Sequence, residues 1–337
     1  MIRAGIVGLG RWGRLLVTAV AGKSDDIGFV LAATRTRANA EDFCREKQIT
    51  LVESYDDILR DPDIDAVVLA TPHSRHRAQA LAAIEANKHV FVEKPLTLDL
   101  NSALAVADAA RKAGLVLAVG LTRRFHPSVA ELRGRARDGR LGKIVAMVAQ
   151  HTTSTAQFIA PDNWRAAPEE APGGAFTAVG VHALDHMIEF AGRVRDVRCV
   201  TARNYPGPSD DTTATMLRFE AGATGLIFCS VATATNFEFA VYGTHGLAEI
   251  SRPDLSRFRF APVATAAPTG LVPAPPDEIL QFSGFDMLHA EMTAFAHSIR
   301  DGNPYPVPIA DVLHGMAVFD AVVQSAKRGD IVAVLGR

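Results

Sequence analysis

The stretch Ile2-Arg3-Ala4-Gly5-Ile6-Val7-Gly8-Leu9-Gly10-Arg11-Trp12-Gly13 decides the fold of the first part of this chain. An apolar run typical of a buried strand ends at Val7, and three glycines follow with the spacing Gly-x-Gly-x-x-Gly. In this pattern the first glycine permits a tight turn, the second lets the backbone approach a pyrophosphate, and the third lets a helix pack on the strand. The stretch therefore predicts a dinucleotide-binding loop, with a chance glycine cluster in a turn as the alternative.

Short apolar runs alternate with helix-like segments through the first third of the chain. The predicted strands are Arg3–Val7, Phe29–Ala33, Ala66–Ala70, His89–Val92 and Val116–Val119. Such continuous apolar runs suit strands buried on both faces of a parallel sheet. Predicted helices such as Arg75–Ala86 and Leu100–Ala113 carry apolar residues at three- and four-residue spacings. The alternation predicts right-handed crossovers and an α/β, doubly wound Rossmann domain over residues 1–122.

Residues 123–337 have a different pattern, in which strand-like runs follow one another through tight turns. The predicted strands are Lys143–His151, Val197–Arg203, Thr212–Phe219, Thr224–Val231, Phe237–Tyr242 and Leu247–Ser251. Helices are predicted at Pro127–Asp138, Phe285–Ile299 and Ile309–Arg328, and the Pro/Ala-rich segment Pro262–Pro276 is predicted to be an extended surface excursion. Strands joined by short turns imply an antiparallel sheet, so this part is predicted to be an α+β domain.

The composition narrows the class of function. The chain has 337 residues, 35 basic and 37 acidic, with a net charge of −2. That length allows two domains, and the charge balance gives no basic field for nucleic acid or anionic lipid, so a small molecule is the expected partner. We expect no signal region and no membrane-spanning stretch, because charged residues interrupt each apolar run. The scattered Cys44, Cys199 and Cys229 fit a reducing cytoplasm and argue against a disulfide framework or a zinc knuckle.

The end of the second predicted strand bears on the choice of dinucleotide. NAD sites usually carry an Asp or Glu there, which accepts hydrogen bonds from the adenosine ribose. This chain has Ala33-Thr34-Arg35-Thr36-Arg37 instead. Nothing in that segment repels a 2′-phosphate, and Arg35 is able to hold one through two hydrogen bonds. NADP(H) is therefore favoured over NAD(H); the alternative is that Arg35 and Arg37 are solvated residues that open a helix.

Lys94, in Glu93-Lys94-Pro95, is the first candidate for chemistry. Hydride transfer between an alcohol and nicotinamide needs a group that takes or gives the hydroxyl proton. A partly desolvated lysine near a cationic nicotinamide has a lowered pKa and suits that role. The alternative is that Lys94 pairs with Glu93 or caps a loop. The Lys94-Pro95 bond is a candidate cis peptide.

A second cluster runs from Gly173-Gly174 to Asp185. Its glycines suggest a loop that lets the following helix approach a ligand closely. His182 and Asp185 lie three residues apart on that predicted helix and so project from one face. With His186 they can also be interpreted as a metal site, but neighbouring polar residues on a helix need no ion, and no metal is predicted.

As an ordered set, these motifs resemble those of the Gfo/Idh/MocA oxidoreductases, the glucose–fructose oxidoreductase and inositol dehydrogenase group. The likeness covers nearly the whole length. It rests on the glycine loop, Ala70-Thr71-Pro72 with His76, Asn87-Lys88-His89-Val90, Glu93-Lys94-Pro95, Arg124-Phe125-His126-Pro127, Trp164-Arg165, Gly173-Gly174, Gly180-x-His182-x-x-Asp185 and Gly243-x-x-Gly246.

The resemblance implies an N-terminal Rossmann domain and a C-terminal domain on an open antiparallel sheet, one face of which commonly forms a homodimer or homotetramer interface. It implies hydride transfer between nicotinamide and a sugar, inositol, dihydrodiol or related hydroxy or keto compound, with Lys94 and His182 handling the proton. Arg124, Trp164 and Asp185 are the implied substrate contacts, although Arg124 is equally well explained by a structural ion pair. The implied cofactor contacts are Gly8, Gly10, Arg11, Trp12, Gly13, Thr34, Arg35, Thr71, Pro72, His76, Glu93, Lys94 and Arg165.

One position departs from the family pattern. Many polyol dehydrogenases of this family carry an Asp four residues before the histidine, and here that position is Ala178. Alanine can neither orient an imidazole nor accept a proton. Two alternatives to net redox chemistry therefore stay open: a cofactor-retaining glycosidase-like or lyase-like enzyme, and a non-catalytic ligand sensor that depends on the dinucleotide.

Overall fold

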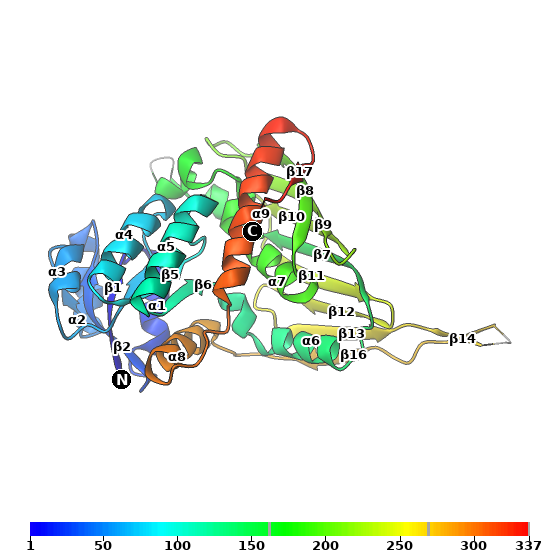
Figure 1. Ribbon diagram of the computed structural model, residues 1–337, viewed down its shortest axis with the longest axis horizontal. Helices are drawn as coiled ribbons and strands as arrows, with labels where there is room; N and C mark the ends of the chain where they lie inside the picture. The colour runs from blue at the N-terminus through cyan, green and yellow to red at the C-terminus, as the bar shows by residue number, and fades with distance from the viewer. Residues whose placement is uncertain (161–162, 268–269, 336–337) are drawn as a thin grey trace. The chain divides into compact units, whose positions relative to one another are not determined.

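The computed structural model describes residues 1–160, 163–267 and 270–335 (Figure 1). The chain forms two compact units, Met1–Thr122 with Asp286–Met316 and Arg123–Phe285 with Ala317–Arg337. The first unit thus combines the N-terminal segment with Asp286–Met316, which joins it through packing between segments far apart in the sequence.

The first unit is built on a six-stranded parallel sheet with the order β3-β2-β1-β4-β5-β6. The strands are β1 (Ile2–Val7), β2 (Ile27–Ala33), β3 (Thr50–Leu51), β4 (Ala66–Leu69), β5 (His89–Glu93) and β6 (Leu117–Gly120). Only β3, which has two residues, has no counterpart among the predicted strands. The doubly wound Rossmann prediction is confirmed. The strand order reverses between β1 and β4, and in such sheets ligands bind beyond the carboxyl ends of the strands at this point.

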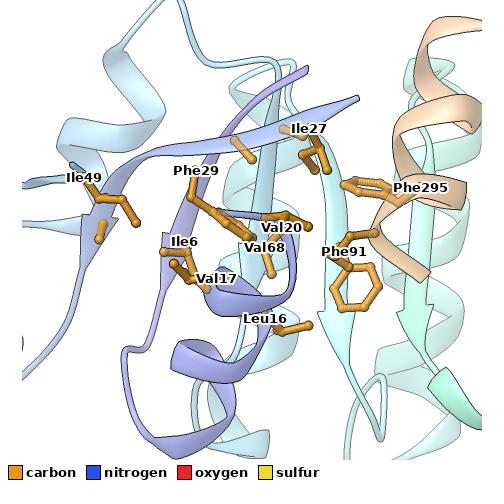
Figure 2. Packing of buried hydrophobic residues seen from close by; sticks show 14 of the residues in the cluster. Ile6, Leu16, Val17, Val20, Ile27, Phe29, Ile49, Val68, Phe91 and Phe295 are labelled. Carbon is orange, nitrogen blue, oxygen red and sulfur yellow. The ribbon is translucent and has the colours of Figure 1, made fainter. Parts of the chain in front are cut away.

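The helices of the first unit bury their apolar faces against this sheet. They are α1 (Arg11–Val20), α2 (Glu41–Glu46), α3 (Tyr55–Arg60), α4 (His73–Glu85), α5 (Leu100–Ala113) and α8 (Met287–Arg300). Figure 2 shows Leu16, Val17 and Val20 of α1 packed in the same cluster as Phe91 of β5. Phe295 of α8 packs edge-on against Phe91, with ring centroids 5.7 Å apart. This fully buried ring holds α8 in the first unit's core.

The second unit is built on a nine-stranded sheet with the order β16-β13-β12-β11-β7-β10-β9-β8-β17. Its strands are β7 (Ile144–Thr152), β8 (Val194–Ala202), β9 (Thr212–Phe219), β10 (Thr224–Ser230), β11 (Asn236–Gly243), β12 (Gly246–Ser251), β13 (Arg257–Pro262), β16 (Glu278–Gln281) and β17 (Val332–Ala333). β7 and β10 pair in parallel, whereas the other neighbours are antiparallel. The mainly antiparallel α+β prediction is therefore confirmed.

Two features of the second unit go beyond the sequence pattern. The first is a hairpin, β14 (Thr265–Ala267) and β15 (Gly270–Val272), which extends from the sheet within the segment predicted to be an extended surface excursion (Figure 1); residues 268 and 269 lie outside the described residues. The second is a π-helical turn, Phe176–Gly180, which leads directly into α7 (Val181–Ala191). Single π-turns of this kind are frequent at functional sites.

The remaining long helices are α6 (Pro127–Arg137) and α9 (Ile309–Arg328). By length and composition α9 passes the test for a membrane-spanning helix, although the charged residues Asp311 and Asp320 lie within it. Half of its apolar window is buried inside the protein, as in the core helix of a globular domain. Phe319 of α9, for example, packs against Phe176 with ring centroids 6.3 Å apart.

Candidate functional site

The glycine loop after β1 has the geometry that its spacing predicts. Gly8 has φ +97°, a conformation that glycine adopts at little cost. A Cβ on Gly13 would overlap the carbonyl oxygen of Gly8, so only glycine lets α1 begin this close to the loop. At Gly10, by contrast, no described atom lies within 4 Å of the position a Cβ would take. That open space beside the N-terminus of α1 is what a pyrophosphate needs.

The two arginines that follow β2, Arg35 and Arg37, have different surroundings. Arg37 donates to the carbonyl oxygens of Val52 and Leu51 and pairs with Glu53 at 3.1 Å. Arg35 is exposed, and no ion pair involving it is recorded among the described residues. Thr34 beside it is half-buried. Of the two arginines, Arg35 is therefore the one whose side chain is exposed.

The segment after β4 is tied to the segment after β5 by His76. Its Nδ1 lies 2.9 Å from the carbonyl oxygen of Pro95, and its Nε2 lies 3.1 Å from that of Thr71. Carbonyl oxygens only accept hydrogen bonds and a neutral imidazole has one N–H, so this fully buried ring donates to one of the two carbonyls while it packs between both loops. Pro72 precedes α4, and the Lys94-Pro95 peptide bond is cis. His76 thus supports the predicted nicotinamide side from within.

Lys94 follows β5, and Glu93, the last residue of that strand, is hydrogen-bonded to the glycine-loop segment. The Glu93 carboxylate accepts a hydrogen bond from the indole Nε1–H of Trp12. It also lies 3.3 Å from the backbone nitrogen of Lys94. Arg11, between Gly10 and Trp12, is exposed. The loop after β1 and the segment after β5 are therefore connected through a buried carboxylate within the first unit.

In the second unit, the predicted substrate contacts Arg124 and Asp185 bind each other. Arg124 donates from Nε to Asp185 Oδ2 at 2.8 Å, and its Nη2 lies 2.7 Å from Oδ1. The two side chains are 3% and 6% exposed, so this is a buried bidentate pair. Glu189 Oε2 lies 3.8 Å from Arg124 Nε, and Glu189 also pairs with Arg133 at 2.6 Å. This geometry supports the structural interpretation of Arg124.

His182 lies in the first turn of α7, buried beside a second histidine that the sequence did not single out. The ring of His151, on β7, has its centroid 6.0 Å from that of His182. His151 Nδ1 lies 3.1 Å from the carbonyl oxygen of Val179, and its Nε2 lies 3.1 Å from Nη2 of Arg123. A carbonyl only accepts and a guanidinium only donates, so His151 is the neutral tautomer with its proton on Nδ1.

Arg123 stands over the ring of Phe237, 4.2 Å from its centroid. Burial lowers the pKa of its guanidinium to about 10, which still leaves it charged at neutral pH. The ring face and His151 partly offset the loss of water around this cation. One signal in the sequence pointed to His151: Met147 and Ala149 alternate inward along β7, so a histidine two residues further on also points inward.

The remaining predicted residues do not gather at one point. Trp164 and Arg165 lie in a short 3-10 turn, where the guanidinium stacks 4.2 Å from the indole ring. His186 is fully buried against Phe239, with ring centroids 5.4 Å apart. Neither of its ring nitrogens has a hydrogen-bond partner, and burial holds its pKa well below the ordinary value. The described residues contain no group of three His, Cys, Asp or Glu side chains arranged to hold a metal ion.

Comparison with known proteins places these features in a family. Residues 2–121 match the model of the GFO_IDH_MocA oxidoreductase family with an NAD-binding Rossmann fold, and residues 129–249 match the GFO/IDH/MocA C-terminal domain. A 1,5-anhydro-D-fructose reductase from Ensifer adhaerens is 30% identical over 82% of both chains. A trans-1,2-dihydrobenzene-1,2-diol dehydrogenase from Sus scrofa is 27% identical, over 66% of this chain and 66% of that enzyme.

Among solved structures, a levoglucosan dehydrogenase in complex with NADH superposes on this chain with a TM-score of 0.89. The superposition covers 100% of both chains at 22% sequence identity. At that identity the likeness establishes the shared two-part fold and nothing about the substrate.

Proposed function

This chain belongs to the Gfo/Idh/MocA oxidoreductase family, and on that basis we propose that it is an NAD(P)-dependent oxidoreductase acting on CH–OH groups. Its substrate is a sugar, inositol, dihydrodiol or related hydroxy or keto compound. Two relatives, a 1,5-anhydro-D-fructose reductase and a trans-1,2-dihydrobenzene-1,2-diol dehydrogenase, act on compounds of this class. The observation that carries the proposal is the glycine loop at the switch point, with Lys94 at the end of β5.

The glycine loop fits a dinucleotide, because a Cβ is excluded at Gly8 and Gly13 while the space at Gly10 is open. The bound nicotinamide supplies hydride chemistry. Within this proposal Lys94 moves the proton of the reacting hydroxyl, and His182 hydrogen-bonds the same group or shares the proton. Trp164 and Arg165 contribute to substrate and cofactor contacts. Arg124 and Asp185 take a supporting part, because each neutralises the other.

Replacing Lys94 with Ala is the decisive test of this assignment. The absorbance change of NADPH and NADH is followed with sugars, inositols, dihydrodiols and their keto forms. We expect a loss of about 100-fold or more in turnover, since a positioned acid–base group contributes roughly 100- to 10,000-fold. The dissociation constant of the dinucleotide should change little. Turnover equal to that of the parent protein would remove Lys94 from the chemistry.

We further propose that NADP(H) is preferred, because Arg35 is exposed at the end of β2 and no carboxylate occupies residues 34–36. The NADH complex of the structural relative points the other way, so the comparison of both cofactors is essential. Arg35→Ala should weaken NADPH binding about tenfold or more, the value of a charge-assisted hydrogen bond, and leave NADH unchanged. Arg37→Ala is the matched control, because Arg37 is held by Val52 and Leu51. Equal effects of both variants would refute the Arg35 assignment.

Ala178 is the reason to test two alternatives to net redox chemistry. It lies in the π-helical turn before α7, where a carboxylate stands in many polyol dehydrogenases of the family. Product formed without net change in NADPH or NADH would identify a lyase-like or glycosidase-like reaction with internal redox. Tight dinucleotide binding with no turnover on the whole panel would support a ligand sensor.

We also propose that the protein is a homodimer or homotetramer that associates through the outer face of the nine-stranded sheet. Large apolar side chains are exposed on that face of β8 to β11, namely Val200, Met216, Leu226, Phe228 and Tyr242. Strand pairing puts them on one side, with Met216 directly opposite Leu226. Exposed apolar patches of this kind mark interaction sites. Light scattering tests this: Leu226→Glu should lower the mass to that of a monomer, and a monomeric parent protein would end the proposal.

A further inference from the structure

The Glu93 carboxylate is buried and hydrogen-bonded at the end of β5. The residue is 8% exposed, although ionised side chains are rarely buried without partners. One partner is the indole Nε1–H of Trp12, and the backbone nitrogen of Lys94 lies 3.3 Å from Oε2. A carboxylate that accepts from both is oriented by them and in turn fixes them.

Gly120 provides the space in which this carboxylate sits. It is the last residue of β6 and pairs directly with Glu93 across the parallel strands. A Cβ on Gly120 would lie 3.0 Å from Oε1 and 3.1 Å from both Cδ and Oε2 of Glu93. Those are closer than ordinary van der Waals contacts, so a larger residue would displace the carboxylate. The φ of Gly120 lies outside the left-handed region, and the missing side chain is therefore a matter of space.

Trp12 carries the connection to the dinucleotide loop. It lies in the first turn of α1, one residue before Gly13, whose contact with Gly8 fixes the loop. Its indole is half-buried against the core of the first unit. A movement of the indole therefore moves the helix N-terminus that faces a phosphate. Through Glu93, the same movement reaches the backbone of Lys94.

We propose that Glu93 is a positioning residue whose carboxylate, seated in the space left by Gly120, ties Trp12 of the dinucleotide loop to the backbone of Lys94. The orientation of Lys94 and the shape of the dinucleotide loop are then set together. The inference rests on the proposed function in one respect, because it takes Lys94 as the residue that moves the proton. It assigns Trp12 a task besides cofactor contact, namely to hold the carboxylate.

The first test displaces the carboxylate without changing it. Gly120→Ala should weaken the binding of NADPH about tenfold and lower turnover by a similar factor, as expected for the loss of a hydrogen bond to a charged group. Gly120→Ala with Glu93→Asp should restore both, because aspartate is one carbon shorter and leaves room for the new methyl group. Gly134→Ala is the control, since nothing lies within 4 Å of that position and its φ is also ordinary.

A spectroscopic measurement reports the contact without any ligand. The chain has two tryptophans, so Trp164→Phe leaves the emission of Trp12 alone. In that background Gly120→Ala should shift the emission of Trp12, and Glu93→Asp should return it toward the starting value. Glu93→Leu removes the acceptor for the indole, so it should shift the emission of Trp12 and weaken NADPH binding as Gly120→Ala does.

The outcomes separate this inference from the proposed function. If Gly120→Ala leaves the Trp12 emission and the NADPH dissociation constant unchanged, Glu93 does not position the loop. Failure of Glu93→Asp to restore a folded Gly120→Ala protein, judged by circular dichroism, would also refute the inference. Full turnover in Lys94→Ala would instead remove the role of Lys94, while the effects of Gly120→Ala on Trp12 and on NADPH binding would stand.

Discussion

The pair Arg124–Asp185 gives the sharpest prediction, because the sequence left Arg124 open between a substrate contact and a structural ion pair. Arg124→Met leaves the Asp185 carboxylate, 6% exposed, without the guanidinium that donates to it at 2.8 Å. Breaking a buried pair by removing one partner costs about 3–5 kcal/mol, because an uncompensated charge stays buried. We therefore expect the free energy of unfolding to fall by about that amount in urea unfolding followed by circular dichroism.

Two controls make this prediction specific. The double variant Arg124→Met, Asp185→Leu removes both charges and should recover most of the loss, since apolar replacements of buried pairs are often neutral. Arg140→Met breaks a pair with Asp138 of 2.7 Å, but both side chains are nearly half exposed. It should cost less than about 1 kcal/mol. A loss below about 1 kcal/mol for Arg124→Met, together with a raised KM at full stability, would show that Arg124 binds substrate.

Three further predictions follow from the site and the core. Gly10→Ala should keep the stability of the parent protein but weaken NADPH binding. Gly13→Ala should unfold more easily, because of these two positions only Gly13 would bring a Cβ against backbone atoms. Urea midpoints and NADPH titration distinguish the two variants, and equal midpoints would contradict this geometry. His151→Phe loses the hydrogen bonds to Val179 and Arg123 beside His182, so it should lower turnover about tenfold while the protein stays folded. Unchanged turnover would show that His182 does not depend on His151. Burial keeps the pKa of His186 low, so the imidazole is neutral in the folded protein and takes up a proton on unfolding below about pH 6.5. The free energy of unfolding should therefore fall as the pH drops below that value, by at most about 1.4 kcal/mol per pH unit. The variant His186→Phe should flatten that slope.

Much of the fold could be predicted from local patterns. The glycine loop, the apolar runs and the segment Thr212–Phe219 appear in the structure close to the predicted bounds, because buried strands and tight turns impose short-range rules on the sequence. The misses were of two kinds. Four strands of the six- and nine-stranded sheets were not predicted: β13 and β16, and also β3 and β17, which at two residues each are too short to carry a pattern. The helix α8 was placed along the chain correctly but returns to the core of the first unit.

The candidate site residues also fall into two groups, those that local patterns predict and those whose contacts depend on packing. The residue types at Gly8, Gly13 and Lys94 are dictated by local geometry or chemistry, so the sequence was enough to single them out. The sequence could not say which arginine after β2 is exposed; in the structure Arg37 donates to the carbonyl oxygen of Val52 and Arg35 is exposed. No spacing rule linked the partners of Arg124, which lies 61 residues from Asp185.

By itself, then, the sequence determined the two-part architecture, the dinucleotide loop and the chemical class of the candidate residues. Tertiary structure decided which side chains meet: Trp12 with Glu93 under the space of Gly120, Arg123 with His151, and α8 with the first sheet. The physical reason is the separation along the chain of the residues that interact. Turns, strands and helix starts are governed by neighbours along the chain, whereas hydrogen bonds between buried groups depend on positions that only the packed core brings within about 3 Å.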